Sequence, residues 1–388
     1  MISVVEAATP VEPASLPPRL SVVLIILTAI AIAGFVLVSH LVTRYRANTK
    51  QIGWHLFQRG VAEANAGNLV RALDEFRAAL TYDPGNSQYQ LSLARALRDS
   101  GRLTESQAYL LSLWERAPQD STINLALARL AVRQHALDNA IRYYHNAIYG
   151  IWDRDPDSNR RNTRLELIQF LIKENALSQA QAELLSMAQT LPPDPKLHLE
   201  VAALFARAGD QERALAEYRQ VLRLDRRNHA ALAGAGETAF QLRRYDLAQH
   251  FLKTAVETDS ADAQSKQLLG TVNLLVSSDP FRPRISDAER NRRLRAAFEH
   301  AGHRLESCAQ LLQLDLASPS ANGLHDLSVQ WTQLKPKLRQ LRTAGETDLP
   351  DTIMDLVSTI EQKTAQQCGP PTGIDLALSL ISHQAEAD

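Results

Sequence analysis

The side chains that could bind a metal ion are few and scattered in this sequence. Asp153, Asp155 and Asp157 have the alternating spacing of the first ligands in a calcium-binding loop. Ser158, however, stands where such a loop needs glycine, and Arg164 stands where it needs a bidentate glutamate. We therefore interpret this segment as a solvent-exposed loop without a bound ion.

Other patterns that could support catalysis are equally incomplete. His300 and His303 would share one face of a helix, but a zinc site needs three or four protein ligands. The GAGETA segment at 234–239 matches the loose dinucleotide fingerprint without the preceding strand that the fingerprint requires. No Walker phosphate loop, HExxH, GxSxG or CxxC motif is present. The sequence predicts no enzyme, and no catalytic residue, metal site, cofactor or small-molecule substrate.

Two cysteines, Cys308 and Cys368, are too few for a disulfide-dense scaffold or a cysteine-rich zinc module. Cys308 falls on an apolar helical stripe, where a free thiol acts as a small hydrophobic side chain. Cys368 lies in the QQCGPPTG segment, which is typical of a loop. In an oxidising compartment the two could form a disulfide, and the sequence leaves both possibilities open.

The charge balance argues against a nucleic-acid partner. Among 388 residues, 42 basic and 43 acidic side chains give a formal charge of −1, whereas nucleic-acid binders usually carry a large basic excess. One local run of arginines consists of Arg282, Arg284, Arg290, Arg292, Arg293 and Arg295. Asp287 and Glu289 lie within this run, and Phe281 is the only aromatic beside it. We interpret the run as a solvated surface rather than a site for anionic lipid or nucleic acid.

An uncharged apolar segment, Leu20–Thr43, lies between Arg19 and Arg44. As a helix it would measure about 36 Å, enough to cross a hydrocarbon core of about 30 Å. The acidic residues Glu6 and Glu12 precede it, and no A-x-A cleavage site follows, so it does not fit a cleaved signal peptide. We predict a single transmembrane helix.

The basic residues that flank this segment bear on its orientation. Arg19 precedes the span, whereas Arg44, Arg46 and Lys50 follow it. Because the more basic flank tends to stay in the cytoplasm, this difference favours an inner-membrane protein with a cytoplasmic body. The alternative is a body in the bacterial periplasm, where the cysteines could pair.

The rest of the chain is dominated by a repeat of about 34 residues. Each repeat holds a small residue in its second helix and a large apolar residue four positions later. Another small residue stands twelve positions before the first, except in the fourth repeat, where Ile168 occupies that position. The first small residue recurs at Ala72, Ser106, Ala140, Ala180, Ala214 and Ala248. Two antiparallel helices pack closely only where one offers a small side chain to the bulk of the other, so the pattern predicts stacked helix pairs.

This register resembles the tetratricopeptide repeat family, whose unit is a helix–turn–helix of 34 residues. The resemblance covers Gly53–Val276, with six repeats and a seventh first helix, and suggests a membrane-anchored bacterial member. It implies that the first helices line a concave groove, into which positions 2, 5, 9, 12 and 13 of each repeat face. The groove residues carried over are Arg95, Arg98, Leu125, Arg129, Arg133, Leu165, Lys173, Leu199 and Arg207.

The predominance of arginine among these positions indicates a protein or peptide partner that is acidic and partly apolar. The lysine–asparagine clamp of chaperone-binding family members is missing, because Phe57 and Val61 occupy its first positions. A chaperone-binding cochaperone is therefore less well supported than a general scaffold.

The C-terminal region begins with a long helix whose expected N-cap is Ser286, and we interpret it as a helical cap on the array. The expected fold is all-α: a tail at 1–19, a transmembrane helix at 20–43, an α-solenoid at 53–276 and a helical region at 282–388. The expected function is a membrane-anchored scaffold that recruits a partner. The alternative is a periplasm-facing accessory factor or chaperone in secretion or envelope assembly.

Overall fold

The computed structural model describes residues 18–319, 323–339 and 348–385 and is almost entirely helical in those ranges. The only β-pairing among them is an isolated parallel bridge between Asp120 and Ile151. The predicted all-α class is therefore confirmed. The chain divides into two compact units, Met1–Leu165 and Glu166–Asp388, and the helix α7 (Pro156–Lys173) contains the point of division.

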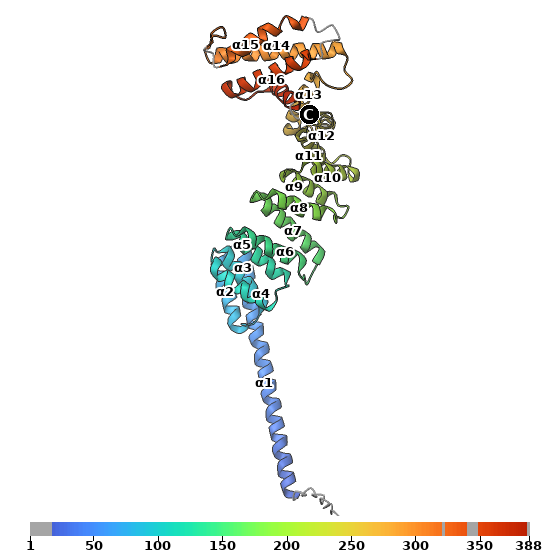
Figure 1. Ribbon diagram of the computed structural model, residues 1–388. Coiled ribbons are helices and arrows are strands. Elements are labelled where there is room, and N and C mark those ends of the chain that lie inside the picture. The colour runs from blue at the N-terminus through green and yellow to red at the C-terminus, as the bar shows by residue number, and fades with distance from the viewer. Residues whose placement is uncertain (1–17, 320–322, 340–347, 386–388) are drawn as a thin grey trace, which may run out of the picture. The chain divides into compact units, whose positions relative to one another are not determined.

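The first unit consists of helix pairs (Figure 1). Its other helices are α1 (Pro18–Asn65), α2 (Leu69–Tyr82), α3 (Ser87–Asp99), α4 (Leu103–Arg116), α5 (Ser121–Arg133) and α6 (Leu137–Tyr149). The C-terminal part of α1 packs on α2, α3 on α4, and α5 on α6, and each pair packs on the next. Phe57 stacks on Tyr89 with ring centroids 4.8 Å apart, and Phe76 is 2% exposed, so the repeated apolar positions form the core.

Glycines and polar caps define the ends of these helices. Gly67 and Gly101 follow the first helices of their pairs with φ of 81° and 83°, a left-handed conformation that glycine adopts without steric cost. Asn86 caps α3 by accepting hydrogen bonds from Gln88 N and Tyr89 N. Glycine turns and a polar cap therefore set the limits of these helices.

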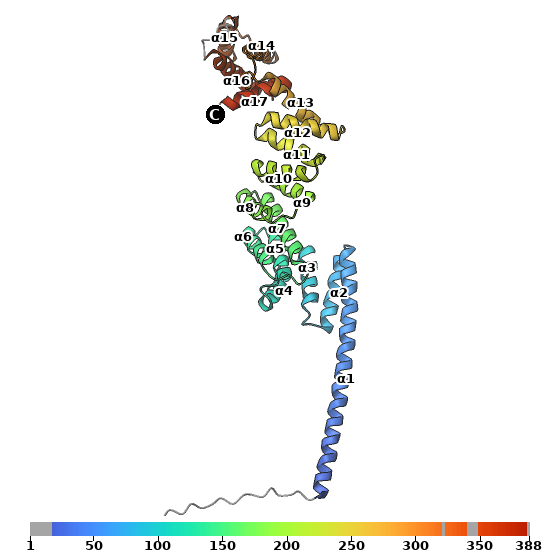
Figure 2. The same ribbon diagram turned by 90° about the vertical axis from the view of Figure 1, so that its right-hand side faces the viewer.

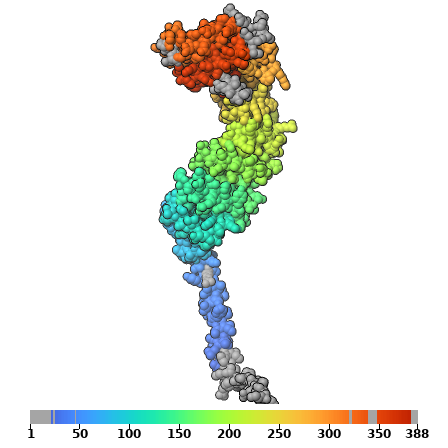
Figure 3. Space-filling view, viewed as in Figure 1, coloured from blue at the N-terminus to red at the C-terminus, as the bar shows by residue number. Residues whose placement is uncertain are grey.

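The apolar N-terminal segment and the first repeat helix form one continuous helix, α1, of 48 residues. Its most apolar 18-residue window has a mean hydropathy of 2.2, and none of that window is buried within the structure. In the space-filling view this part of α1 stands clear of the other helices of its unit (Figure 3). The sequence placed a boundary between residues 43 and 53, but the helix passes through it without a break.

The second unit begins with the same kind of pairs. Its helices α8 (Leu177–Ala188), α9 (Pro195–Arg207), α10 (Gln211–Leu224), α11 (His229–Gln241), α12 (Tyr245–Thr258) and α13 (Ala263–Ser278) continue the helical array. The helix α9 packs on α10 and α11 on α12, and α12 packs on α13 (Figure 2). Gly209 has a φ of 82° at the turn after α9.

Four helices of the second unit form its C-terminal region: α14 (Asp287–Leu311), α15 (Leu324–Leu334), α16 (Leu349–Cys368) and α17 (Gly373–Ala385). Ser286 caps α14 by accepting a hydrogen bond from Glu289 N, as the sequence predicted. The last helix, α17, packs against α13, α14 and α16, so the end of the chain supplies much of the cover over the array (Figure 2). Cys308 and Cys368 form a disulfide with their Cα atoms 5.7 Å apart.

Candidate functional site

Four of the five arginines predicted to line the groove lie on two adjacent first helices of the first unit, and the fifth, Arg207, lies in the second unit. Arg95 and Arg98 belong to α3, and Arg129 and Arg133 belong to α5. The helices α3 and α5 contact each other directly, while α4 packs against both. Side chains three and four positions apart share a helix face, so Arg95 and Arg98 share one face of α3, and Arg129 and Arg133 share one face of α5. The small side chains that pack on α4 lie on a different face.

Arg95 is half-buried beside other cations. Burial is the main reason that the pKa of its guanidinium is lowered, and the positive charges of Arg129 and Arg98 lower it further. Asp120 and Asp99 raise the same pKa, but their effect is smaller. Three guanidinium groups therefore lie close together in a partly desolvated region.

The acidic residues near this cluster already have partners. Asp99 accepts a hydrogen bond of 2.8 Å from Nε of Arg98, whose side chain is only 14% exposed. Asp120 is the N-cap of α5 and accepts hydrogen bonds from Thr122 N and Ile123 N. An anionic group of a partner would be attracted to Arg95, whose guanidinium is half-buried beside two other cations.

The remaining predicted groove residues differ in accessibility. Leu125 and Leu165 are only 9% and 8% exposed, because their side chains pack in the helical core, so neither offers an open apolar contact. Arg133 is exposed at the end of α5. In the second unit, Lys173 and Arg207 are exposed at the ends of α7 and α9, and Leu199 is half-buried.

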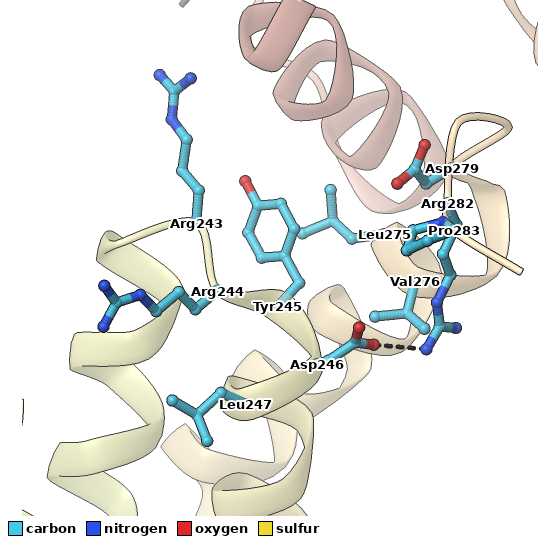
Figure 4. Close-up of a pocket in the computed structure, with 10 residues that line it drawn as sticks. All are labelled: Arg243, Arg244, Tyr245, Asp246, Leu247, Leu275, Val276, Asp279, Arg282 and Pro283. Carbon is cyan, nitrogen blue, oxygen red and sulfur yellow. Dashed lines mark hydrogen bonds and ion pairs between the residues drawn. The ribbon is translucent and has the colours of Figure 1, made fainter. Parts of the chain in front are cut away.

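A pocket of about 380 Å³, which the sequence did not suggest, lies in the second unit (Figure 4). It is lined by Arg243, Arg244, Tyr245, Asp246, Leu247, Leu275, Val276, Asp279, Arg282 and Pro283. Figure 4 shows the Arg243 guanidinium at one end of the pocket, the Tyr245 ring and Leu275 in the middle, and Asp279 at the other end.

Most charges in this pocket are neutralised locally. Arg282 forms an ion pair with Asp246, and Arg244 contacts both carboxylate oxygens of Glu212 at 2.7 and 3.0 Å. Burial raises the pKa of Tyr245, which weighs against its use as a base, and also that of Asp279. The pocket therefore combines apolar side chains, Leu247, Leu275 and Val276, with charged groups that are largely paired with one another or with Glu212.

The arginine run before and within α14 is engaged in internal contacts. Glu289 accepts hydrogen bonds from Arg292 and Arg293, and these bonds are the main reason that its pKa is lowered to about 2. Arg293 also donates to the backbone oxygens of Val276 and Asp279, each at 2.9 Å. The prediction of a solvated surface therefore fits Arg292, which is 72% exposed, but not Arg293, which is only 12% exposed.

Among the described residues, no group of three or more histidine, cysteine, aspartate or glutamate side chains could hold a metal ion. Asp155 has a φ of 41° in the loop that the sequence compared with a calcium site, and Asp157 lies in the first turn of α7. His303 contacts Glu306 at 3.7 Å and is largely exposed.

Comparison with known proteins supports helical repeats. Residues 64–130 match the family model of the tetratricopeptide repeat. The C-terminal part of a TPR repeat-containing protein from Cytophaga hutchinsonii is 12% identical, with a TM-score of 0.44 over 69% of this chain and 98% of that chain. A search of the curated proteins gives no match.

Two further solved structures match parts of this chain. The first is pilF of Pseudomonas aeruginosa, which is 14% identical with a TM-score of 0.39 over 57% of this chain and 96% of that chain. The second is YrrB, described as a TPR protein with an unusual peptide-binding site, which is 16% identical with a TM-score of 0.37 over 49% of this chain and 94% of that chain.

Proposed function

We propose that this chain, a tetratricopeptide repeat protein, is a membrane-anchored scaffold that binds a partner protein through the first helices of its repeats. The observation that carries the proposal is the cluster of Arg95, Arg98 and Arg129 on α3 and α5. Holding like charges together in a partly buried region is unfavourable for the isolated fold, as the lowered pKa of Arg95 indicates. A partner carboxylate would relieve this repulsion.

The partner that suits this cluster is an acidic segment with some apolar residues. Leu91 is half-buried on α3, one helical turn before Arg95, where it packs against the core, and its exposed part would offer a partner the apolar contact that the buried Leu125 does not. Carboxylates form bidentate hydrogen bonds with guanidinium groups, which adds directional selectivity to the general attraction between charges.

Binding of defined peptides to the full-length protein in detergent micelles tests this proposal. Fluorescence anisotropy would compare a peptide of glutamate and leucine with one in which lysine replaces each glutamate. We expect binding of the acidic peptide, and weaker binding as salt increases, because exposed charges are screened. Equal binding of the two peptides, or no binding of either, would contradict the acidic-partner proposal.

The membrane anchor is the apolar N-terminal part of α1. Its side chains are highly exposed, with Phe35 at 74% and Ile32 at 64%, and such a surface is stable in lipid but not in water. We expect the protein to stay in membranes through high-salt and alkaline-carbonate washing. Release by either treatment would contradict the anchor.

For the compartment, two observations favour opposite sides of the membrane. Three basic residues after the apolar segment against one before it favour a cytoplasmic body. The Cys308–Cys368 disulfide favours an oxidising compartment, because cytosolic thiols are kept reduced. A difference of two basic side chains is a weak topological signal, so we give the disulfide more weight and propose a periplasmic body. This supports the accessory role in secretion or envelope assembly.

A C-terminal reporter fusion tests this orientation. Alkaline phosphatase fused after Asp388 would be active if the body is periplasmic, whereas a green fluorescent reporter at the same position would be fluorescent if it is cytoplasmic. Maleimide labelling of unfolded membranes with and without reductant gives an independent result. Two thiols that label without reductant would contradict the periplasmic proposal.

A further inference from the structure

A buried carboxyl group lies where three C-terminal helices meet, away from the candidate binding site. Glu361, on α16, has no exposed surface. Neither of its carboxyl oxygens accepts a hydrogen bond from the described part of the chain, although Nε of Arg304 lies 2.9 Å from Oε2. Burial raises the pKa of Glu361 to about 8, and the nearby Asp375 adds to this effect, while Arg304 opposes it.

Arg304, on α14, holds the neighbouring helices together. Its Nε donates to Oγ1 of Thr364 on α16 at 2.8 Å, and its Nη1 donates to Oδ2 of Asp375 on α17 at 3.0 Å. Its Nη2 donates to the backbone oxygen of Gly369 at 3.1 Å. The guanidinium therefore joins α14, α16 and α17 through three separate groups.

The helix that Arg304 holds is the one that packs against the last helix of the array. Ala377, Leu378 and Ile381 of α17 are buried in the same apolar cluster as Leu275 of α13. Asp375 lies in the first turn of α17, so its bond to Arg304 fixes the beginning of this helix. If α17 moved away, the apolar side of α13 that it covers would be exposed.

We propose that protonation of Glu361 controls the docking of α17 on α13. Glu361, Arg304 and Asp375 together form a pH-sensitive contact, called the clasp below, that holds α17 in place. With a proton on Glu361, Arg304 and Asp375 form a balanced ion pair and α17 stays docked. When Glu361 loses the proton, its buried carboxylate and the half-buried carboxylate of Asp375 share one guanidinium. Separation of α17 admits water to these charges, so ionisation favours the open form.

The charged groups around Glu361 leave it as the main titrating group of the clasp. Arg304 faces it from α14 and Asp375 faces it from α17. His300 and His303, also on α14, are exposed at the rim of the adjoining pocket of about 420 Å³. On α15, Asp326 is exposed to solvent. A variant of Glu361 separates any contribution of the two histidines from that of the clasp.

The direction of the pH effect follows from the two states. The closed form binds the Glu361 proton up to about pH 8, whereas a solvated glutamate loses it near pH 4.3. The open form therefore gains population as pH rises between these values, by up to about tenfold per pH unit, and the change levels off above pH 8.

Hydrogen exchange of the α17 amides in the full-length protein in detergent micelles measures this opening. Exchange rates at pH 5.5, 7 and 8.5, divided by the intrinsic rates of an unfolded peptide, give the opening equilibrium. We expect opening to increase with pH in the wild type and to be independent of pH in Glu361→Gln, since glutamine is neutral and similar in size. Equal pH dependence in both proteins, or none in the wild type, would overturn the proposal.

A second variant keeps the test decisive if Glu361→Gln does not fold. Asp375→Asn retains an oxygen that can accept the Arg304 hydrogen bond but removes the charge that disfavours ionisation of Glu361. We expect its opening to level off at a lower pH than in the wild type. An unchanged profile in Asp375→Asn would equally contradict a clasp in which these charges are coupled.

Discussion

A Cβ atom on Gly60 would lie 2.7 Å from Cδ1 of Phe76, closer than two carbon atoms approach. The Phe76 ring is only 2% exposed and is enclosed by α1, α2 and α3, so it has little room to move aside. The same relationship recurs between Gly236 and Leu252, where the distance would be 2.6 Å. The small and large residues that define the repeat in the sequence are therefore direct packing partners.

Replacing Gly60 by alanine is expected to destabilise the first helix pair. Overpacking of a filled core costs about 1–3 kcal/mol, which exceeds the roughly 1 kcal/mol that alanine gains over glycine inside a helix. Thermal unfolding followed by circular dichroism should show a lower melting temperature for Gly60→Ala. The matched control is Gly270→Ala in α13, where a Cβ meets nothing within 4 Å and the substitution should stabilise. A melting temperature that rises equally in both variants would contradict this account.

Charge reversal in the arginine cluster is expected to abolish binding of the acidic peptide. In Arg95→Glu/Arg129→Glu, two attractive charges become repulsive at the place where the peptide carboxylates would bind. We expect a loss of at least tenfold in affinity, about 1.4 kcal/mol, measured by anisotropy at low salt. Arg71→Glu is the control, because Arg71 is exposed on α2, a second helix. A similar loss in the control would indicate a general effect of charge rather than a site.

Arg95→Met is expected to separate binding from stability. Removing one of three crowded cations should leave the fold equally stable or stabilise it by up to about 1 kcal/mol, the scale of a single exposed charge interaction. Peptide affinity should nevertheless fall, because the cation that would face the partner is lost. Chemical denaturation and peptide binding on the same preparation measure both quantities. A parallel loss of stability and affinity would indicate that Arg95 has only a structural role.

The disulfide is expected to stabilise the C-terminal helices. It closes a loop between residues 60 positions apart, for which chain entropy predicts about 4 kcal/mol and measured effects are usually about 2–4 kcal/mol. Cys308→Ser/Cys368→Ser should unfold this region at a lower denaturant concentration, which the fluorescence of Trp331, packed on Phe298, would report. Reductant should destabilise the wild type and leave the double variant unchanged. If reductant has no effect on the wild type, the disulfide does not contribute to stability.

Part of the candidate site could be predicted from the sequence because it depends on helix position alone. Arg95, Arg98 and Arg129 follow from the repeat register, which places them on one face of adjacent first helices. The burial of Leu125 could not be predicted from that register, since it depends on how closely the neighbouring helices approach. Glu361 could have been noticed, because it continues the apolar spacing of Ile353 and Val357 along α16, but its partners lie on other helices.

The sequence by itself determined the features that depend on short separations along the chain: the helical repeat, the N-cap at Ser286 and the apolar N-terminal segment. Helical periodicity and side-chain volume act between residues a few helical turns apart, so their pattern can be recognised in the amino-acid sequence alone. Only the tertiary structure decided that Cys308 pairs with Cys368, that α17 returns to cover α13, and that Arg304 meets Asp375. Those contacts join segments about 60 to 100 residues apart, and their formation depends on the packing of every helix between them.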